Sequence, residues 1–81
     1  MDRKVIEEKV LEIVANLLDR EKEDLNLTDS FTQDLSADSL TIIEIMTECE
    51  EEFQLTINDE ETENIKTIDD AIGYIHNQLG S

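Results

Sequence analysis

The chain has 81 residues, which is enough for one small domain with a single core. It carries 22 acidic and six basic residues, a formal net charge of −16. Such a surface repels nucleic acid and anionic membranes and attracts basic partners. The lone cysteine excludes an internal disulfide and suits a reducing compartment. No apolar run approaches the roughly 20 residues that span a bilayer. We therefore expect residues 1–81 to form one cytoplasmic, monomeric domain without nucleic-acid binding or membrane insertion.

The acidic residues are unevenly distributed. Residues 1–22 carry five bases and six acids, whereas residues 23–81 carry sixteen acids and a single base, Lys66. This asymmetry has two interpretations: the acids keep a small protein soluble, or they steer basic partners toward the second part of the chain. Composition alone does not separate them.

The first predicted element is an amphipathic helix of about four turns. Its apolar residues recur at steps of three and four, namely Ile6, Val10, Ile13, Val14, Leu17 and Leu18. Periodicity then lapses through residues 19–37, where turn-forming residues dominate. Four apolar residues in this stretch predict a long loop pinned to the core, namely Leu25, Leu27, Phe31 and Leu35. A loop of this length in a compact domain usually has a functional reason.

The second predicted helix begins at Ser39, with Asp38 as its N-cap. At 100° per residue, one arc of this helix holds the core side chains, namely Ile42, Ile45, Met46, Cys49 and Phe53. The opposite side is acidic but includes Leu40, flanked by Ile43. Two exposed aliphatic residues beside an acidic row are typical of a docking strip.

Two further helices complete the prediction. Asn58 caps a short helix that ends near Asn64, and Thr67 with Asp70 forms a capping box that opens the last helix. Gly80 is expected to stop that helix. The fold class is therefore all-α: a small four-helix bundle of three longer helices and one short helix, with a long loop between the first two.

Catalytic and metal-binding options are few. His76 is the only histidine, and a pair of Cys49 with His76 is disfavoured because Cys49 falls in the middle of the core arc. No Cys or His cluster exists, and the acidic runs lack the alternating ligands and glycine of a calcium loop. We therefore expect neither an enzyme nor a metal site.

Ser39 is the residue with a recognisable context. The string Asp34-Leu35-Ser36-Ala37-Asp38-Ser39-Leu40 resembles the phosphopantetheine attachment motif of acyl carrier proteins. The resemblance covers about residues 4–76 and continues in Ser30-Phe31, Glu44-Ile45, Glu50-Glu51-Glu52-Phe53, Asp59-Glu60-Glu61 and the segment from Ile65 to Ile75. An Asp-Ser-Leu triplet alone is a weak signal, whereas the whole frame is a strong one.

This resemblance implies a non-catalytic carrier. A phosphopantetheinyl transferase (a holo-acyl-carrier-protein synthase) would attach 4′-phosphopantetheine from coenzyme A to Ser39, with Asp38 and Leu40 flanking the site. The arm would carry acyl chains as thioesters to enzymes of fatty-acid synthesis, or of related polyketide or lipid pathways. Those enzymes would present basic patches to a docking face, which by resemblance consists of Asp34, Asp38, Leu40, Ile43, Glu44, Glu48, Glu50 and Glu51.

The resemblance also implies a pocket that shelters the acyl chain between the helices. The matching positions are Phe31, Ile45, Met46, Cys49, Ile57, Thr62, Ile65, Ala71 and Tyr74. In any helical bundle such residues would also be ordinary core residues.

The chain departs from the family pattern at a few positions. Ser36 replaces the usual glycine, so the loop is expected to bend differently before the motif, and Thr41 replaces a common acid. Two alternatives stay open on the residues: a carrier of D-alanyl or amino-acyl groups, and an acidic interaction or cation-binding module in which Ser39 is only part of a helix start.

Overall fold

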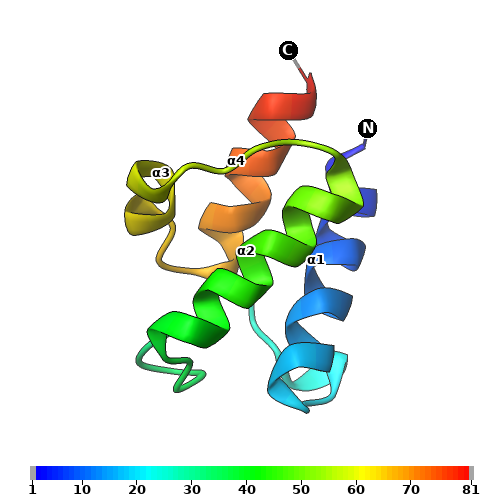
Figure 1. Ribbon diagram of the computed structural model, residues 1–81. Helices are drawn as coiled ribbons and strands as arrows, with labels where there is room; N and C mark the ends of the chain where they lie inside the picture. Colours follow the sequence, from blue (N-terminus) through cyan, green and yellow to red (C-terminus); the bar gives the residue numbers. More distant parts are fainter. Residues whose placement is uncertain (1, 81) are drawn as a thin grey trace.

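Four α-helices joined by loops make up the computed structural model, which describes residues 2–80 (Figure 1). The described residues contain no β-strand beyond an isolated bridge between Ser30 and Thr67. The predicted all-α fold, with three longer helices and one short helix, is confirmed. The elements are α1 (Arg3–Leu18), a 3-10 turn η1 (Lys22–Asp24), α2 (Ser39–Phe53), α3 (Asp59–Asn64) and α4 (Ile68–Gly80).

Helix α1 packs against both α2 and α4, while the short α3 lies at the side of the bundle (Figure 1). Asp2 caps α1 by accepting a hydrogen bond from the Lys4 N–H at 3.1 Å. The helix ends where Asp19 takes a left-handed conformation with φ of 55°. Its buried residues are Ile6, Val10, Val14 and Ala15. Because Ile6, Val10 and Val14 recur every four residues and Ala15 adjoins Val14, one face of the helix closes the core.

Helix α2 begins as predicted. The Asp38 carboxylate accepts a hydrogen bond from the Thr41 N–H at 2.8 Å, so Asp38 is the N-cap. Its buried residues are Ile45, Met46, Cys49 and Phe53, whereas Ile42, which was expected in the same arc, is only half-buried. The first turn of α2 therefore stands partly free of the core.

The caps of α3 and α4 are also confirmed. Asn58 accepts from the Glu61 N–H at 3.0 Å. Thr67 and Asp70 form the reciprocal pair of a capping box: the Thr67 N–H donates to the Asp70 carboxylate, and the Asp70 N–H donates to the Thr67 hydroxyl. Helix α4 ends at Gly80, the residue expected to stop it, although Gly80 does not take the left-handed conformation of a glycine C-cap.

The long loop between α1 and α2 is fastened to the start of α4. Leu25, Phe31 and Leu35 are buried. Backbone bonds reinforce this burial: Phe31 N–H donates to the Lys66 carbonyl at 3.0 Å, and Asp69 N–H donates to the Leu27 carbonyl at 2.8 Å. The loop therefore brings Phe31 beside Lys66, which is 35 residues further along the chain. None of the described helices is long and apolar enough to cross a membrane.

Candidate functional site

Ser39 is the first residue of α2, and it is exposed. The Asp38 cap fixes the start of the helix immediately before it. The pKa of the Asp38 carboxyl is lowered, chiefly because the carboxylate accepts the Thr41 N–H bond. The Ser39 hydroxyl thus stands at the positive end of a 15-residue helix, where a negatively charged group is favoured.

The turn that leads into Ser39 is closed by its own hydrogen bonds. The Asp34 carboxylate accepts from the Ser30 N–H at 2.7 Å, and the Ala37 N–H donates to the Phe31 carbonyl at 2.7 Å. Within this turn Ser36 has a φ of 55°, the left-handed region that glycine adopts most readily. Ser36 therefore takes a conformation that glycine adopts without strain, at the position where serine was expected to alter the bend of the loop.

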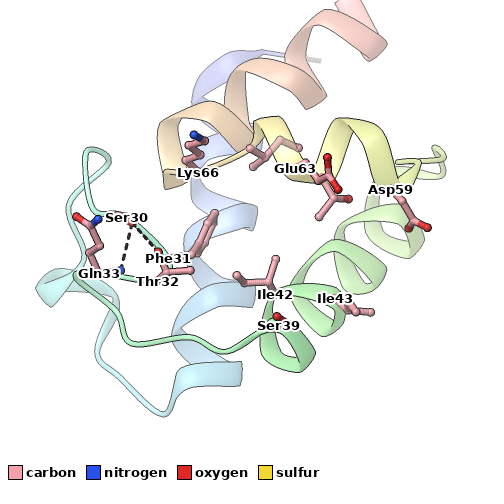
Figure 2. Close-up of a pocket in the computed structure, with 12 residues that line it drawn as sticks. Ser30, Phe31, Thr32, Gln33, Ser39, Ile42, Ile43, Asp59, Glu63 and Lys66 are labelled. Carbon is pink, nitrogen blue, oxygen red and sulfur yellow. Dashed lines mark hydrogen bonds between the residues drawn. The ribbon is translucent and has the colours of Figure 1, made fainter.

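A groove of about 890 Å³ opens directly beside Ser39 (Figure 2). Phe31, Ile42 and Ile65 supply apolar side chains to it, and polar and charged residues surround them. The lining comes from the loop before α2, the first turn of α2, α3 and the segment before α4. We call this the Ser39 groove, and its residues are Ser30, Phe31, Thr32, Gln33, Ser39, Ile42, Ile43, Asp59, Thr62, Glu63, Ile65 and Lys66.

The structure divides the residues that were matched to an acyl pocket. Phe31, Thr62 and Ile65 line the Ser39 groove. The others do not line it: Tyr74 is half-buried, and the rest lie in the closed core, namely Ile45, Met46, Cys49, Ile57 and Ala71. Phe31 and Ile65 belong to both the groove and the core cluster. These two side chains therefore separate the open groove from the closed core.

Sequence reasoning missed several lining residues. Ile42 was assigned to the core arc, although its place one turn after Ser39 was a signal that it could border the same site. Lys66 and Gln33 carried no local signal, because only the fold of the long loop brings them to the groove.

Cys49 lies in the core, as its position in the arc predicted, and its side chain is fully buried. Burial, aided by the nearby charges of Glu48, Glu50 and Glu52, raises the pKa of the Cys49 thiol to about 12. The thiol is therefore uncharged near neutral pH and is a poor nucleophile. Among the described residues no group of three or more His, Cys, Asp or Glu side chains is placed to hold a metal ion.

One surface of α2 combines apolar and acidic side chains. Leu40 and Ile43 are 64% and 55% exposed. Around them in the sequence are five exposed acids of the expected docking set, namely Asp34, Asp38, Glu44, Glu48 and Glu51. We refer to these seven residues as the α2 strip. Exposed aliphatic side chains with acids nearby in the sequence could meet a basic surface that has a small hydrophobic patch.

Glu50, the remaining acid of that expected set, differs from the others. It is half-buried, and its carboxylate accepts a hydrogen bond from the Ile57 N–H at 2.8 Å. This bond ties α2 to the loop that leads into α3. The structure therefore gives Glu50 a role in holding that loop, and we leave it out of the α2 strip.

Comparisons with known proteins agree with this geometry. The family model for the phosphopantetheine attachment site matches residues 8–75, a span that includes Ser39. The acyl carrier protein of Exiguobacterium sibiricum is 40% identical over 70 residues, which cover 86% of this chain and 89% of the relative.

Two solved structures have the same fold. The acyl carrier protein from Enterococcus faecalis superposes with a TM-score of 0.78 at 36% identity, covering 93% of this chain and 95% of the other. A Mycobacterium tuberculosis protein assigned to the acyl carrier proteins gives a TM-score of 0.85 at 26% identity, covering 91% and 99%.

Proposed function

Because this chain belongs to the acyl carrier proteins, whose prosthetic group is 4′-phosphopantetheine, we propose that Ser39 bears that group. The protein would then carry growing acyl chains as thioesters in fatty-acid synthesis or a related polyketide or lipid pathway. One observation carries the proposal: the exposed Ser39 hydroxyl stands at the N-terminus of α2, beside an open groove and within the matched span.

The residues around Ser39 fit a phosphodiester-linked arm. The hydroxyl is accessible to an incoming enzyme, and the helix N-terminus favours the negative phosphate. The Asp38 carboxylate is engaged by the Thr41 N–H, which fixes the helix start next to the phosphate position. The Ser39 groove offers apolar surface along which an attached chain could lie.

In the attachment step, the Ser39 oxygen forms a bond to the phosphorus that carries the pantetheine of coenzyme A. The pyrophosphate P–O bond breaks, and adenosine 3′,5′-bisphosphate leaves. The hydroxyl proton would pass to a base of the transferase, since the adjacent Asp38 carboxylate is already engaged by the Thr41 N–H. The product is a serine phosphodiester with a free terminal thiol.

The carrier itself supplies no catalytic group. When bound, the arm provides the thiol on which acyl groups are held as thioesters. The protein's contribution is to tether that thiol, which raises its effective concentration in the active site of each partner. Cys49 cannot compete for the acyl group because its thiol is buried and protonated.

The α2 strip is the proposed docking surface. Partner enzymes with Arg and Lys patches would meet the exposed acids, and Leu40 and Ile43 would enter a shallow apolar contact. Exposed charge pairs raise the association rate more than the affinity, and salt weakens them. Encounters of this kind are brief, which a cytoplasmic shuttle between several enzymes requires.

The test is loading by a phosphopantetheinyl transferase of broad specificity. With coenzyme A, the intact mass should increase by one phosphopantetheine, and Ser39→Ala should abolish the increase. Ser36→Ala is the matched control, since it removes a serine of the loop just before α2 and should still be loaded. A protein that gains no arm, or a Ser39→Ala variant that still gains one, would refute the proposal.

A further inference from the structure

We propose that Lys66 makes the Ser39 groove selective for acyl chains that carry a neutral oxygen, a keto or hydroxyl group, to which the lysine ammonium donates a hydrogen bond. This inference rests on the proposed function, because the chain reaches the groove only on an arm attached to Ser39. It adds a chemical class of cargo and a residue that recognises it.

The first step is the position of Lys66 relative to the attachment residue. Both residues line the groove, and they lie on opposite sides of it, with Phe31 and Ile42 between them (Figure 2). The acyl chain begins at the far end of the arm, and it would reach Lys66 when the arm folds back so that the chain lies along these apolar side chains. The groove volume of about 890 Å³ lies within the range of small-molecule sites.

The second step is that the backbone of Lys66 is fixed while its charge is not neutralised. Its carbonyl accepts from the Phe31 N–H at 3.0 Å, and its own N–H donates to the Asp70 carboxylate at 3.1 Å. The ion pairs among residues 2–80 use Arg3, Lys9 and Lys22 and leave the Lys66 ammonium without a carboxylate partner. In a chain with 22 acids, an unpaired base at a groove is a distinct feature.

The third step decides which ligand this ammonium favours. A carboxylate would gain from Lys66, but Asp59 and Glu63 border the same groove, and the net charge of −16 adds further repulsion. A plain alkyl chain would contact Phe31 and Ile65 without using the ammonium. A neutral oxygen avoids the repulsion and accepts a charge-assisted hydrogen bond, which is stronger than one between neutral groups.

The experiment loads Ser39 with stable amide analogues of pantetheine that carry one of three six-carbon chains: hexanoyl, 3-oxohexanoyl or adipoyl. The amide signals of Phe31 and Ile65 report the ratio of groove-bound to free chain by nuclear magnetic resonance. The variant is Lys66→Met, which keeps the length of the side chain and removes the donor. Lys4→Met, at an exposed lysine of α1, is the matched control. Lys66→Leu, which also lacks a donor, is a second variant with the same expected result, should the methionine disturb the fold.

We expect the 3-oxohexanoyl chain to have the highest bound ratio, and Lys66→Met to lower that ratio about fivefold, a modest value for a solvent-exposed hydrogen bond to a charged group. The hexanoyl ratio should not change, and Lys4→Met should change neither. The proposal is overturned if Lys66→Met affects hexanoyl equally, if adipoyl binds best, or if the oxo chain leaves Phe31 and Ile65 unperturbed. Absence of any adduct on Ser39 would instead refute the proposed function, and this inference with it.

Discussion

Ser36 holds a backbone conformation that costs a serine free energy. Its φ of 55° places the Cβ close to the carbonyl that follows, a penalty that glycine escapes. Relief of this strain exceeds the extra entropy that glycine loses on folding. We therefore expect Ser36→Gly to raise the free energy of unfolding by roughly 0.5–1 kcal/mol, measured by urea denaturation.

Thr28→Gly is the control for that substitution. Thr28 is exposed in the same long loop and has no positive φ, so glycine there should lower stability. A Ser36→Gly variant that loses as much stability as Thr28→Gly would contradict the strain argument.

The stability that Asp38 gives to the start of α2 depends on pH. Its folded-state pKa is lowered from the ordinary value of 3.8, mainly by the Thr41 N–H, so the carboxylate stabilises the fold above pH 3.8. That contribution is lost as the pH falls through the lower folded-state value. Asp38→Asn keeps an oxygen acceptor but no charge, so the wild type should melt at a higher temperature at pH 7. The difference in melting temperature between wild type and Asp38→Asn should be smaller at pH 3 than at pH 7.

The comparison is made by thermal denaturation at both pH values. Asp24→Asn serves as the control, because the Asp24 side chain caps no helix, and it should show no such convergence. If the difference in melting temperature between wild type and Asp38→Asn is larger at pH 3 than at pH 7, the carboxylate does not stabilise the helix start.

At the scale of the elements, a single side chain connects α2 with the loop before α3. The half-buried Glu50 accepts the Ile57 N–H at 2.8 Å, and Ile57 is buried. Glu50→Ala should lower the free energy of unfolding by about 1 kcal/mol and speed hydrogen exchange at the Ile57 amide, because that N–H loses its acceptor. Glu50→Gln keeps an acceptor and should have a smaller effect.

Glu51→Ala is the matched control for Glu50. Glu51 is an exposed neighbour on the same helix, and its removal should leave the Ile57 amide unchanged. Equal hydrogen-exchange rates at the Ile57 amide in Glu50→Ala and Glu51→Ala would contradict the structural role that we assign to Glu50.

A separate prediction concerns partner docking on the exposed face of α2. Glu44→Lys reverses one charge of the α2 strip and should lower kcat/KM of a phosphopantetheinyl transferase about tenfold at low salt, mainly by slowing association. Added salt should narrow the difference. Glu12→Lys makes the same change on the exposed side of α1 and should have little effect. Similar kinetics for both variants would argue against docking on α2.

The helices could be predicted from the sequence because their determinants are local. The cap at Asp38 and the capping box of Thr67 with Asp70 each involve residues three apart, and both occur as expected. The Ser39 groove could not be predicted in this way. It depends on Phe31 meeting Lys66 through a backbone bond across 35 residues, and neither neighbourhood signals that contact.

The same distinction explains the division of the expected acyl pocket. Periodicity identifies inward-facing residues such as Met46 and Cys49, but it does not tell a closed core from an open groove. That difference depends on how the loop and α3 pack beside α2.

For the whole molecule, repulsion among the acids opposes folding. The ion pairs of Arg3 with Asp69 and of Lys9 with Glu52 join α1 to α4 and α2, but their side chains are exposed and stabilise little. Because salt screens the larger repulsion of a net charge of −16, the melting temperature should rise when NaCl is increased from low concentration to about 1 M.

Glu51→Gln provides the control for this effect. It removes one negative charge from an exposed position without breaking an ion pair among the described residues. The variant should therefore be more stable than the wild type at low salt and nearly equal to it at high salt. A melting temperature that falls with salt would mean that the ion pairs outweigh the repulsion.

The burial of Cys49 has a consequence for how the protein can be handled and how it responds to oxidants. It is the only cysteine of the chain, and its sulfur is closed off from solvent in the folded state. In the loaded form, the one thiol that reagents reach is therefore the end of the arm. Oxidation would join two loaded molecules arm to arm and leave unloaded molecules as they are, so thiol labelling of the folded protein counts attached arms directly.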